Sequence, residues 1–590
     1  MCYHTHMPKK YSVKEKVSDN LVEQLLHNRG IDTAEERERF LNPDFVNHLH
    51  DPFLLPDMKK AVDRILKAIE KNERIGIWSD YDADGIPGGA LLHDFFKLIG
   101  FNNFINYIPD RHIEGYGLNN EGLEELANPL VGEGVKLLIT IDCGIRDHKE
   151  IEHAKKLKME VIVTDHHEPH FTKASQGKPA TDDLPKAYAV VNPKRMDSKY
   201  PEKILCGTGV VWKMIEALRL SALAQGKPFN FMPGKEKWLL DLVGLATLSD
   251  MVPLVGENRV LARFGLAVLQ KNRRLGLSKL FYNLRINKNN INEDDIAFMI
   301  TPRINAASRM GHPRDAFKLL TATNEAEADV HAKHLDNINN ERKGMVASIV
   351  KEAKKKIKEK CASEGEKPVI VLGNPDWRPA LLGLVANTIA DEYNRPVFLW
   401  GRASDPAEGE VEGLLKGSCR SDGTTDLVAL MERAKDCFAE FGGHKLSGGF
   451  SVLFEKIHNL EDALVEASTH VVNNGVEIFV DAELSLKDIS ENSVSEILRL
   501  APFGVGNEKP IFIFRDILPE KINRFGKAKE HLSINFRDGQ NTIRAISFFT
   551  ALDQFGDSLK EGIKTNLVAN IEKSFYNGSS EIRLRIVDFF

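Results

Sequence analysis

Short apolar runs alternate with amphipathic stretches in the first part of the chain. The runs are RIGIW at 74–78, FINYI at 104–108, KLLITI at 136–141, VIV at 161–163 and AYAVV at 187–191. Polar turns rich in acids and then helical stretches follow them, and an amphipathic helix is predicted before them at 58–71. Strands that alternate with helices in this way predict a parallel, doubly wound α/β sheet.

The pattern changes twice further along the chain. A helical block covers about 238–360, and its charged, nearly unbroken end at 325–360 is long enough to connect two domains. A second α/β unit begins at 368 with VIVLG, a helix near 381–392 and PVFLW at 396–400. Beyond about 475, five short alternating runs separated by turns predict a small β-barrel.

These changes divide the chain into predicted domains. We expect a flexible N-terminus at 1–19, a first α/β domain with N-terminal helices at 20–315, and a connecting helix at 316–362. A second α/β domain at 363–472 and the β-barrel at 473–590 follow. A chain of 590 residues is expected to have about four domains at about 150 residues per domain. Three domains and a connecting helix are compatible with this expected number.

Composition narrows the class of protein. The chain is 42% hydrophobic and 28% charged, as in proteins that fold around a core. Six scattered cysteines without a CxxC pair favour a reducing cytoplasm, and no signal peptide or apolar run of about 18 residues is found. We therefore expect neither secretion nor membrane insertion. The formal charge of −6, from 79 Lys and Arg against 85 Asp and Glu, argues mildly against a nucleic-acid partner.

The densest group of carboxylates directly follows the first apolar run. Asp80, Asp82 and Asp84 alternate in the string DYDADG, and three such charges repel one another unless cations bind between them. A solvated acidic turn is the alternative for this string taken alone. An EF-hand loop is excluded, because its twelfth position is Leu91 rather than Glu and a strand precedes it.

Three further strings place polar side chains at the ends of predicted elements. Asp142 ends the run LLITI, Asp165, His166 and His167 follow EVIVT, and Asp250 ends an apolar helical stretch. Because parallel strands collect ligands at their carboxyl ends, we expect the groups that follow the three strands to share one site. Oxygen ligands with one or two imidazoles suit Mn²⁺ or Mg²⁺, and the lack of nearby cysteine argues against structural zinc. The carboxylates suffice for two ions, which serve in-line displacement at phosphorus.

The order of these strings resembles a known superfamily. DYDADG, IDCG, DHH and SDMVPL are similar to the four motifs of the DHH phosphoesterases. Further strings resemble the RecJ family of single-strand-specific 5′→3′ exonucleases: YIPDRHIEGYGLN at 107–119, PRINAASRMG at 302–311, KGSCRS at 416–421, FGGHKLSGGF at 441–450 and APFGVGNEKPIF at 501–512. The resemblance runs from about residue 20 to the end. It implies a DHH domain, a connecting helix, a DHH-associated domain and an OB-fold barrel.

The resemblance also implies a set of metal ligands. They are Asp80, Asp82, Asp84, Asp142, His166 and Asp250. The first two would bind one of two Mn²⁺ or Mg²⁺ ions, and Asp84, His166 and Asp250 would bind the other. Asp142 would bridge them.

Catalytic and substrate-binding residues follow from the same resemblance. His167 would face the scissile phosphate and stabilise its charge, while Asp165 would orient a histidine and Asp142 would serve catalysis as the bridging ligand. The implied substrate-binding residues are Arg111, Arg303, Asn305, Ser418, Arg420, Gly442, Gly443 and His444. Arg111, Ser418 and Arg420 match positions that bind a terminal 5′-phosphate. Taken alone, Arg111 could equally form a helix-flanking salt bridge, and 442–449 could be a plain glycine-rich turn.

Some positions depart from the family pattern or stay open. IPGG at 86–89 replaces hydroxyl residues, Trp377-Arg378-Pro379-Ala380 replaces a more usual Trp-His-Pro-Gly, and SG at 447–448 replaces two alanines. These changes affect the fine geometry of the cleft rather than the metal ligands. Tyr116 and Trp377 are candidates for stacking on bases, but burial in the core is the better prediction for any single aromatic residue.

The leading hypothesis is a two-metal exonuclease that releases 5′-mononucleotides from the 5′ end of single-stranded DNA in repair and recombination. The alternatives are a phosphodiesterase for short oligonucleotides or cyclic dinucleotides, a manganese pyrophosphatase, and a non-catalytic replication scaffold. The long helix and barrel argue against the phosphodiesterase, the GGHK string at 442–445 argues against the pyrophosphatase, and the complete ligand set argues against the scaffold. The resemblance implies single-strand-binding protein and a RecQ-type helicase as partners, and we expect a monomer.

The six aspartates expected in or beside one metal site account for the formal charge of −6, so the rest of the chain is neutral. Bound divalent ions would offset most of this charge, and the charge of −6 is therefore compatible with a nuclease.

Overall fold

The computed structural model describes residues 10–130, 132–171, 182–232, 234–402, 413–468, 477–526, 529–538, 541–548, 555, 559–576 and 579–590. These residues belong to two compact units. Unit 1 comprises residues 50–250 and 264–474, and unit 2 comprises residues 6–49, 251–263 and 475–590. Within the described ranges, no helix combines the length and the apolar character that a membrane span needs.

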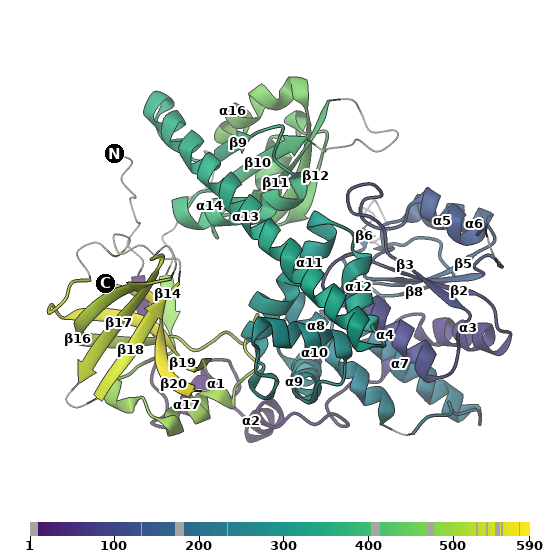
Figure 1. Ribbon diagram of the computed structural model, residues 1–590, viewed down its shortest axis with the longest axis horizontal. Coiled ribbons are helices and arrows are strands. Elements are labelled where there is room, and N and C mark those ends of the chain that lie inside the picture. The colour runs from purple at the N-terminus through teal and green to yellow at the C-terminus, as the bar shows by residue number, and fades with distance from the viewer. Residues whose placement is uncertain are drawn as a thin grey trace, which may run out of the picture. The chain divides into compact units, whose positions relative to one another are not determined.

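A five-stranded sheet forms the first layer of unit 1 (Figure 1). Its strands, in the order β3-β2-β4-β5-β8, are β3 (Phe104–Tyr107), β2 (Ile75–Ser79), β4 (Leu137–Ile141), β5 (Glu160–Thr164) and β8 (Ala189–Val191). Every pairing is parallel. The chain runs from β2 outward to β3 and then crosses to β4 on the other side of β2. Strand order therefore reverses between β2 and β4, where open α/β sheets bind ligands.

Helices cover both faces of this sheet (Figure 1). On one face lie α3 (Met58–Glu70), α4 (Gly85–Leu98) and α7 (Gly207–Ala224), and on the other lie α5 (Asn120–Ala127) and α6 (His148–Lys156). Buried Trp78, Leu138 and Val161 pack under α5 and α6. The predicted doubly wound sheet is confirmed, because alternate residues of each strand supply apolar side chains to opposite layers.

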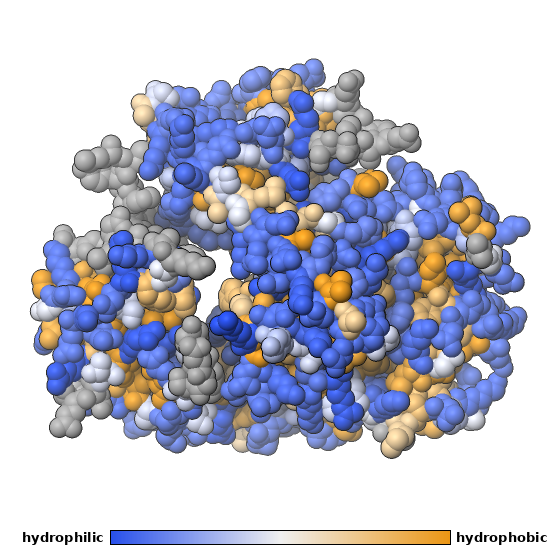
Figure 2. Space-filling model, viewed as in Figure 1, coloured by the Kyte–Doolittle hydropathy of each residue, from blue (hydrophilic) through white to orange (hydrophobic). Residues whose placement is uncertain are grey.

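A helical block and a long helix follow in unit 1. Their bounds are α8 (Leu240–Ser249), α9 (Gly256–Lys271, whose first turns belong to unit 2), α10 (Leu275–Leu284), a π-helix (Asp295–Ile300), α11 (Thr301–Met310), α12 (Arg314–Thr321) and α13 (Glu325–Glu364). The long helix α13 contacts α10, α11 and α12 on one side and α14 (Pro379–Tyr393) further along. Figure 2 shows mainly hydrophilic side chains over α13 with hydrophobic ones scattered among them, which is ordinary for a solvated helix face.

The second sheet of unit 1 is mixed. Its order is β12 (Glu440–His444), β13 (Ser447–Leu453), β11 (Leu414–Arg420), β10 (Val397–Arg402) and β9 (Ile370–Gly373), and only β9 and β10 pair in parallel. One face packs against α14 and against Ile349, Ala353 and Ile357 of α13. The other face packs against α15 (Leu427–Arg433) and α16 (Ile457–Ser468). Helix α13 therefore joins both sheets into one unit, as its length predicts.

Unit 2 is built on a six-stranded sheet. Its strands are β15 (Ala482–Glu483), β16 (Phe512–Phe525), β17 (His531–Asp538), β18 (Asn541–Ser547), β20 (Ser579–Phe589) and β19 (Thr565–Tyr576), in that order. Strand β16 also pairs with β19, so each of the five longer strands pairs with two others. The described strands are longer than the apolar runs that predicted them, because polar residues continue their outward faces.

The N-terminal region differs from its prediction. Residues expected to be flexible include β1 (Lys10–Val13), which pairs in parallel with β14 (Glu477–Val480). Helices α1 (Leu21–His27) and α2 (Ala34–Leu41) belong to unit 2 rather than to the first α/β domain, because Leu25, Leu26 and Phe40 are buried in the same core as the strands and α17 (Glu491–Leu498). Packing between segments more than 400 residues apart carries no local sequence signal.

The connecting helix also begins later than predicted. The prediction placed its start at 316, whereas α12 ends at Thr321 and a break precedes α13. Asn324 caps α13, because its Oδ1 accepts a hydrogen bond from the N–H of Glu327 at 2.9 Å. The unbroken stretch predicted at 325–360 therefore begins at the residue where α13 begins, and only the segment boundary at 316 was placed too early.

Two glycine substitutions test how tightly the helix that carries Asp250 is held. A Cβ at Gly244 of α8 would lie 2.6 Å from the Cα of Gly265 in α9, whereas a Cβ at Gly344 in α13 would meet no atom within 4 Å. We expect Gly244→Ala to lower the free energy of unfolding by about 1–3 kcal/mol through overpacking. Gly344→Ala should raise it by about 0.5–1 kcal/mol through helix propensity. Urea unfolding followed by circular dichroism measures both, and equal effects would contradict the packing at Gly244.

Candidate active site

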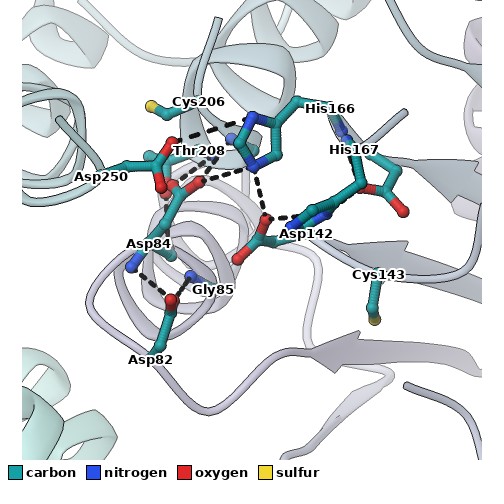
Figure 3. Close-up of polar contacts among 12 residues, drawn as sticks. Asp82, Asp84, Gly85, Asp142, Cys143, His166, His167, Cys206, Thr208 and Asp250 are labelled. Carbon is teal, nitrogen blue, oxygen red and sulfur yellow. Dashed lines mark hydrogen bonds and ion pairs between the residues drawn. The ribbon is translucent and has the colours of Figure 1, made fainter. Parts of the chain in front are cut away.

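The first acidic string forms the turn between β2 and α4 (Figure 3). Asp82 Oδ1 accepts hydrogen bonds from the N–H groups of Asp84 at 2.8 Å and Gly85 at 3.0 Å. Gly85 is required here, because a Cβ would lie 2.6 Å from the carbonyl oxygen of Asp80. The turn therefore folds back on itself and holds Asp80 and Asp84 buried beside a partly exposed Asp82.

Asp84 lies against the N-terminus of α7. Its carboxylate accepts hydrogen bonds from the N–H groups of Gly207 at 2.5 Å and Thr208 at 2.8 Å, and the Thr208 hydroxyl donates to its carbonyl oxygen at 2.7 Å. The partial positive charge of a helix N-terminus stabilises a carboxylate in this position. These contacts of Gly207 and Thr208 were not predicted from the sequence.

Asp142 follows β4 in a left-handed backbone conformation with φ of +61°. This conformation is uncommon for a residue other than glycine and marks a strained position. Its Oδ1 lies 3.1 Å from Nε2 of His166 and 3.8 Å from Nδ1 of His167. A Cβ at Gly207 would lie 2.7 Å from the Cβ of Asp142, so the glycine allows α7 to approach.

Asp165 organises the histidine pair that follows β5. Its Oδ1 accepts hydrogen bonds from the N–H groups of His166 at 2.7 Å and His167 at 3.0 Å, and it lies 2.8 Å from Nδ1 of His167. Its Oδ2 accepts from the N–H of Ile145 at 3.0 Å. The buried carboxylate thus fixes the ring of His167 and leaves Nε2 for another group. The catalytic role of Asp165 remains a prediction.

His166 lies at the centre of the site (Figure 3). Its Nε2 is 3.7 Å from Oδ2 of Asp84, and its Nδ1 is 3.8 Å from Oδ2 of Asp250, which caps the C-terminus of α8. The two histidines therefore face different partners, as expected for neighbours on an extended segment.

Three groups of side chains have the spacing of metal ligands. In each group the ligand atoms lie within 4.8 Å of one another. The groups are Asp80 with Asp82 and Asp142, Asp84 with His166 and Asp250, and Asp142 with His166 and His167. Asp80 Oδ1, Asp142 Oδ1 and His166 Nδ1 are buried without a hydrogen-bond partner, which is costly unless a cation binds. The donor set of oxygens and imidazole fits Mn²⁺ or Mg²⁺.

Burial raises the pKa of the carboxylates at this site. It raises the pKa of Asp80, Asp142 and Asp250 well above the usual range, and repulsion between neighbouring aspartates adds to the shift. The pKa of Asp84 rises to about 6, because burial and Asp82 outweigh the hydrogen bonds from α7. Bound cations would reverse this repulsion.

The two histidines shift in opposite directions. Burial lowers the pKa of His166 to about 3, so its neutral ring can act as a ligand. Burial also acts to lower the pKa of His167, but the hydrogen bond to Asp165 outweighs it and raises the pKa to about 9. Burial would raise the pKa of Asp165, yet its bonds from His167 lower that pKa to about 2. His167 is therefore protonated at neutral pH.

Two cysteines lie beside the site, contrary to the prediction that no cysteine is near it. Cys143 follows Asp142, and Cys206 caps α7 with its Sγ accepting a hydrogen bond from the N–H of Gly209 at 3.3 Å. Burial raises the pKa of both thiols well above the usual range, so both are protonated. Neither thiol belongs to a ligand group among the described residues. Their protonation and their absence from these groups argue against structural zinc.

Sequence reasoning missed the roles of several residues around the site. Tyr116, for which core burial was the better prediction and base stacking the alternative, is 48% exposed. Its hydroxyl donates to the carbonyl oxygen of Asp142 at 3.0 Å and lies 3.2 Å from Nδ1 of His167. Asn192 donates to the carbonyl oxygen of His167 at 2.9 Å. Arg309, within the quoted string PRINAASRMG, lies close enough to Arg111 and Arg420 for burial and mutual repulsion to lower its pKa to about 10.

A cavity of about 650 Å³ contains several of the predicted substrate-binding residues. Arg111, Ser418 and Gly442 line it, together with Arg378 and Lys416. The guanidinium of Arg111 stands over the ring of Tyr81 at 5.1 Å and lowers the pKa of the nearby Asp80. Arg111 therefore borders both the cavity and the carboxylates, and the alternative of a helix-flanking salt bridge does not apply, because it pairs with no carboxylate among the described residues.

The remaining predicted positions vary. Gly443 has a φ of +145°, and a Cβ there would lie 2.4 Å from the carbonyl oxygen of Ser447, so this glycine is required. His444 is exposed at the end of β12. Arg420 donates from Nη1 to the carbonyl oxygen of Cys419 at 2.7 Å. The glycine-rich string forms a strand pair rather than a plain turn.

Arg303 and Asn305 do not have the surroundings of phosphate contacts. Arg303 is 5% exposed, and its guanidinium bonds to Asp336 of α13 at 2.9 Å and to the carbonyl oxygen of Met299 at 2.6 Å. Asn305 Oδ1 accepts a hydrogen bond from the N–H of Ala83 at 3.0 Å and so supports the first acidic turn. The guanidinium of Arg303 and Oδ1 of Asn305 thus bond to protein groups, and their phosphate contacts remain predictions.

The departures from the family pattern also have structural reasons. A Cβ at Gly88 would lie 2.6 Å from Ile141 Cγ2, and one at Gly89 would lie 2.7 Å from Ser79 Oγ. The two glycines therefore let α4 pack closely on β2 and β4. Trp377 is 2% exposed and donates from Nε1 to Glu352 at 3.0 Å, so the prediction of a core position is confirmed.

Comparisons with known proteins identify the family. The chain matches models of the DHH family N-terminal domain at residues 74–247, the DHHA1 domain at 366–471 and the RecJ OB domain at 480–588. It is 32% identical to the single-stranded-DNA-specific exonuclease RecJ of Bacillus subtilis over 574 residues, which cover 96% of this chain and 67% of that protein. It is 30% identical to the RecJ of Haemophilus influenzae, with 96% of each chain covered.

Solved structures agree with the sequence comparison. The crystal structure of RecJ in complex with Mn²⁺ from Thermus thermophilus is 26% identical and has a TM-score of 0.75, with 97% of this chain and 76% of that chain covered. A crystal structure of exonuclease RecJ bound to manganese is 30% identical and has a TM-score of 0.56, with 70% of this chain and 95% of that chain covered. The predicted fold class is confirmed.

The sheet, the carboxylate and histidine groups at its edge and the second domain define a DHH-family protein with a DHHA1 domain. Such a site suits hydrolysis of phosphate esters. The chain belongs to the RecJ family.

The raised carboxylate pKa values predict that metal binding depends on pH. Because Asp84 has a pKa of about 6 without metal, a bound ion must displace its proton below that pH. We expect Mn²⁺ affinity to rise as the pH increases through about 6, with proton release greater at about pH 6 than at about pH 8. Calorimetry in two buffers of different ionisation enthalpy measures both.

Asp462→Asn is a matched control, because Asp462 is 84% exposed on α16. Its pH profile should coincide with that of the unsubstituted protein. An affinity that stays constant across this pH range would contradict the protonation of the buried carboxylates.

Proposed function

We propose that this protein is a divalent-metal-dependent exonuclease that degrades single-stranded DNA from the 5′ end and releases 5′-mononucleotides. The observation that carries the proposal is the set of three ligand groups linked through Asp142 and His166. One relative of similar length and one longer relative are named single-stranded-DNA-specific exonucleases, and structures of relatives contain Mn²⁺ or Mg²⁺. Repair and recombination of DNA are the processes that such an activity would serve.

Each residue has a proposed part in hydrolysis. Asp80, Asp82 and Asp142 hold one ion, and Asp84, His166 and Asp250 hold a second next to it, with Asp142 shared. When bound, such ions lower the pKa of water and neutralise charge on a phosphate.

His167 acts beside these ligands rather than as one of them. It keeps its proton near neutral pH because Asp165 holds Nδ1, and Nε2 can then donate a hydrogen bond to the scissile phosphate. Tyr116 holds the backbone of Asp142 and the ring of His167 in place.

The cavity beside the metal site supports attack at the 5′ end. Arg111, Ser418 and Arg420 are the proposed contacts of the terminal 5′-phosphate, and Arg309 adds a cation beside Arg111. An arginine fork matches a phosphate group in geometry and charge. Gly442, Gly443 and His444 form the edge strand along which the DNA backbone approaches.

The alternatives have less support. A scaffold would not need buried carboxylates that repel one another, since these cost stability without cations. A phosphodiesterase for dinucleotides or a pyrophosphatase would have no use for the RecJ OB domain at residues 480–588. OB folds bind single strands through stacking and a basic groove.

We extend the proposal to the setting of the enzyme. Residues 50–315 would form the catalytic domain, 316–362 the connecting segment, 363–472 the substrate-binding domain and 473–590 the nucleic-acid-binding domain, with 20–49 joined to the last. The protein would act in the cytoplasm as a monomer. It would meet single-strand-binding protein and a RecQ-type helicase on its substrate.

Removal of the shared carboxylate tests the metal mechanism. We expect Asp142→Asn to lower kcat by about a thousandfold or more, because several kcal/mol of charge stabilisation is lost. Single-stranded DNA labelled at either end, in Mn²⁺ and in Mg²⁺, measures rate and direction together. Asp462→Asn should keep full activity. Digestion that starts at the 3′ end, or normal turnover by Asp142→Asn, would refute the proposal.

A second test concerns the terminal phosphate. We expect a substrate with a 5′-hydroxyl to be cut about 10–100-fold more slowly than its 5′-phosphate counterpart, because charge-assisted hydrogen bonds to arginine are lost. Ser418→Ala should reduce this preference. Equal initial rates on the two substrates would count against the contacts assigned to Arg111, Ser418 and Arg420.

A further inference from the structure

The cavity beside the metal site carries more positive charge than a terminal monophosphate needs. Arg111, Arg378 and Lys416 line it, and Glu440 is the one carboxylate among its lining residues. Arg309 lies near Arg111 and Arg420, since both arginines act to lower its pKa. Among the described residues, three cations and one carboxylate therefore line this cavity.

The cavity is also larger than one phosphate group. Its volume of about 650 Å³ falls within the range of about 300–1,000 Å³ that is typical of whole small-molecule sites. Part of its floor has no side chains. Gly442 and Gly449 pair across β12 and β13, Ser418 pairs with Gly449, and a Cβ at Gly442 would meet nothing within 4 Å. A ligand can therefore approach the backbone closely.

The additional cations of the cavity come from a different part of unit 1 than Arg111. Arg111 borders Asp80, whereas Arg378 and Lys416 come from the second sheet and its helix α14. Lys416 and Ser418 are two residues apart on β11 and share a face, at a spacing of about 7 Å. Arg378 and Lys416 line the same cavity as Arg111 and Ser418, so one ligand that fills the cavity can contact all four. Among the described residues, none bonds to the guanidinium of Arg378.

We propose that this cavity binds a 5′-polyphosphate end, with Arg378 and Lys416 contacting the β- and γ-phosphates. The proposal rests on the proposed 5′→3′ activity and names a further substrate class for it. Water would attack the phosphorus that joins the first two nucleotides, and the bond to the 3′-oxygen of the first would break. The first product is then a nucleoside 5′-triphosphate with a 3′-hydroxyl, and the remaining strand carries a 5′-monophosphate.

The test compares three 3′-labelled DNA strands of one sequence that end in a 5′-triphosphate, a 5′-monophosphate or a 5′-hydroxyl. The full-length protein with Mn²⁺ should cut the triphosphate strand within about threefold of the rate on the monophosphate strand. Mass spectrometry should find the deoxynucleoside triphosphate as the first product. A triphosphate strand cut no faster than the hydroxyl strand would overturn the proposal.

Variants at the cavity separate charge from structure. Arg378→Gln and Lys416→Gln should lower the ratio of triphosphate to monophosphate rates by about tenfold, and Arg378→Lys should restore much of it. Lys355→Gln is the control, because Lys355 is 77% exposed on α13 away from the cavity. An unchanged ratio in both glutamine variants would also overturn the proposal.

Failure of this inference can be distinguished from failure of the proposed function. Digestion of the monophosphate strand from its 5′ end, with rejection of the triphosphate strand, refutes the polyphosphate site alone. No digestion of the monophosphate strand from the 5′ end refutes both.

Discussion

Repulsion between buried carboxylates is the constraint on which the architecture of unit 1 depends. Asp80, Asp84 and Asp142 are each at most 5% exposed, and burial raises the pKa of all three. The protein offsets part of this cost with backbone N–H groups, since α7 begins where Gly207 and Thr208 donate to Asp84. The close approach of α7 and the left-handed conformation of Asp142 bring the same carboxylates together. The remaining repulsion between these carboxylates is therefore offset only when cations bind.

The sequence predicted those parts of the site that local pattern determines. Asp80 to Asp84, Asp142 and the pair His166 and His167 each follow an apolar strand, and parallel strands must bring their carboxyl ends to one edge. Asp250 required the family resemblance, because a helix end has no fixed place relative to a sheet. Tyr116 and Thr208 escaped prediction since their hydroxyls contact residues that are distant in sequence.

Packing between distant segments produced contacts that were not predicted. Arg303 forms an ion pair with Asp336 on α13, and nothing near either residue in the sequence signals this pairing. The helices α1 and α2 present ordinary apolar faces that would suit either unit, and they pack on the C-terminal one. Gly88 and Gly89 show the opposite case. They were expected to affect the fine geometry of the cleft, and the structure explains them by the tight contact between α4 and the strands.

The distribution of cations, rather than the net charge of −6, indicates where an anionic substrate binds. The lysine-rich stretch of α13 is balanced by acids, with Lys354 close to Glu392, Lys356 close to Glu352 and Lys360 close to Glu461. Exposed pairs of this kind contribute little to stability and offer little net field to a phosphate. Arg111 and Arg378 differ, because no carboxylate among the described residues pairs with either guanidinium. A cation that folding leaves unpaired beside a cavity remains available to a ligand, and this distinguishes the arginines at the cavity from the more numerous lysines on α13.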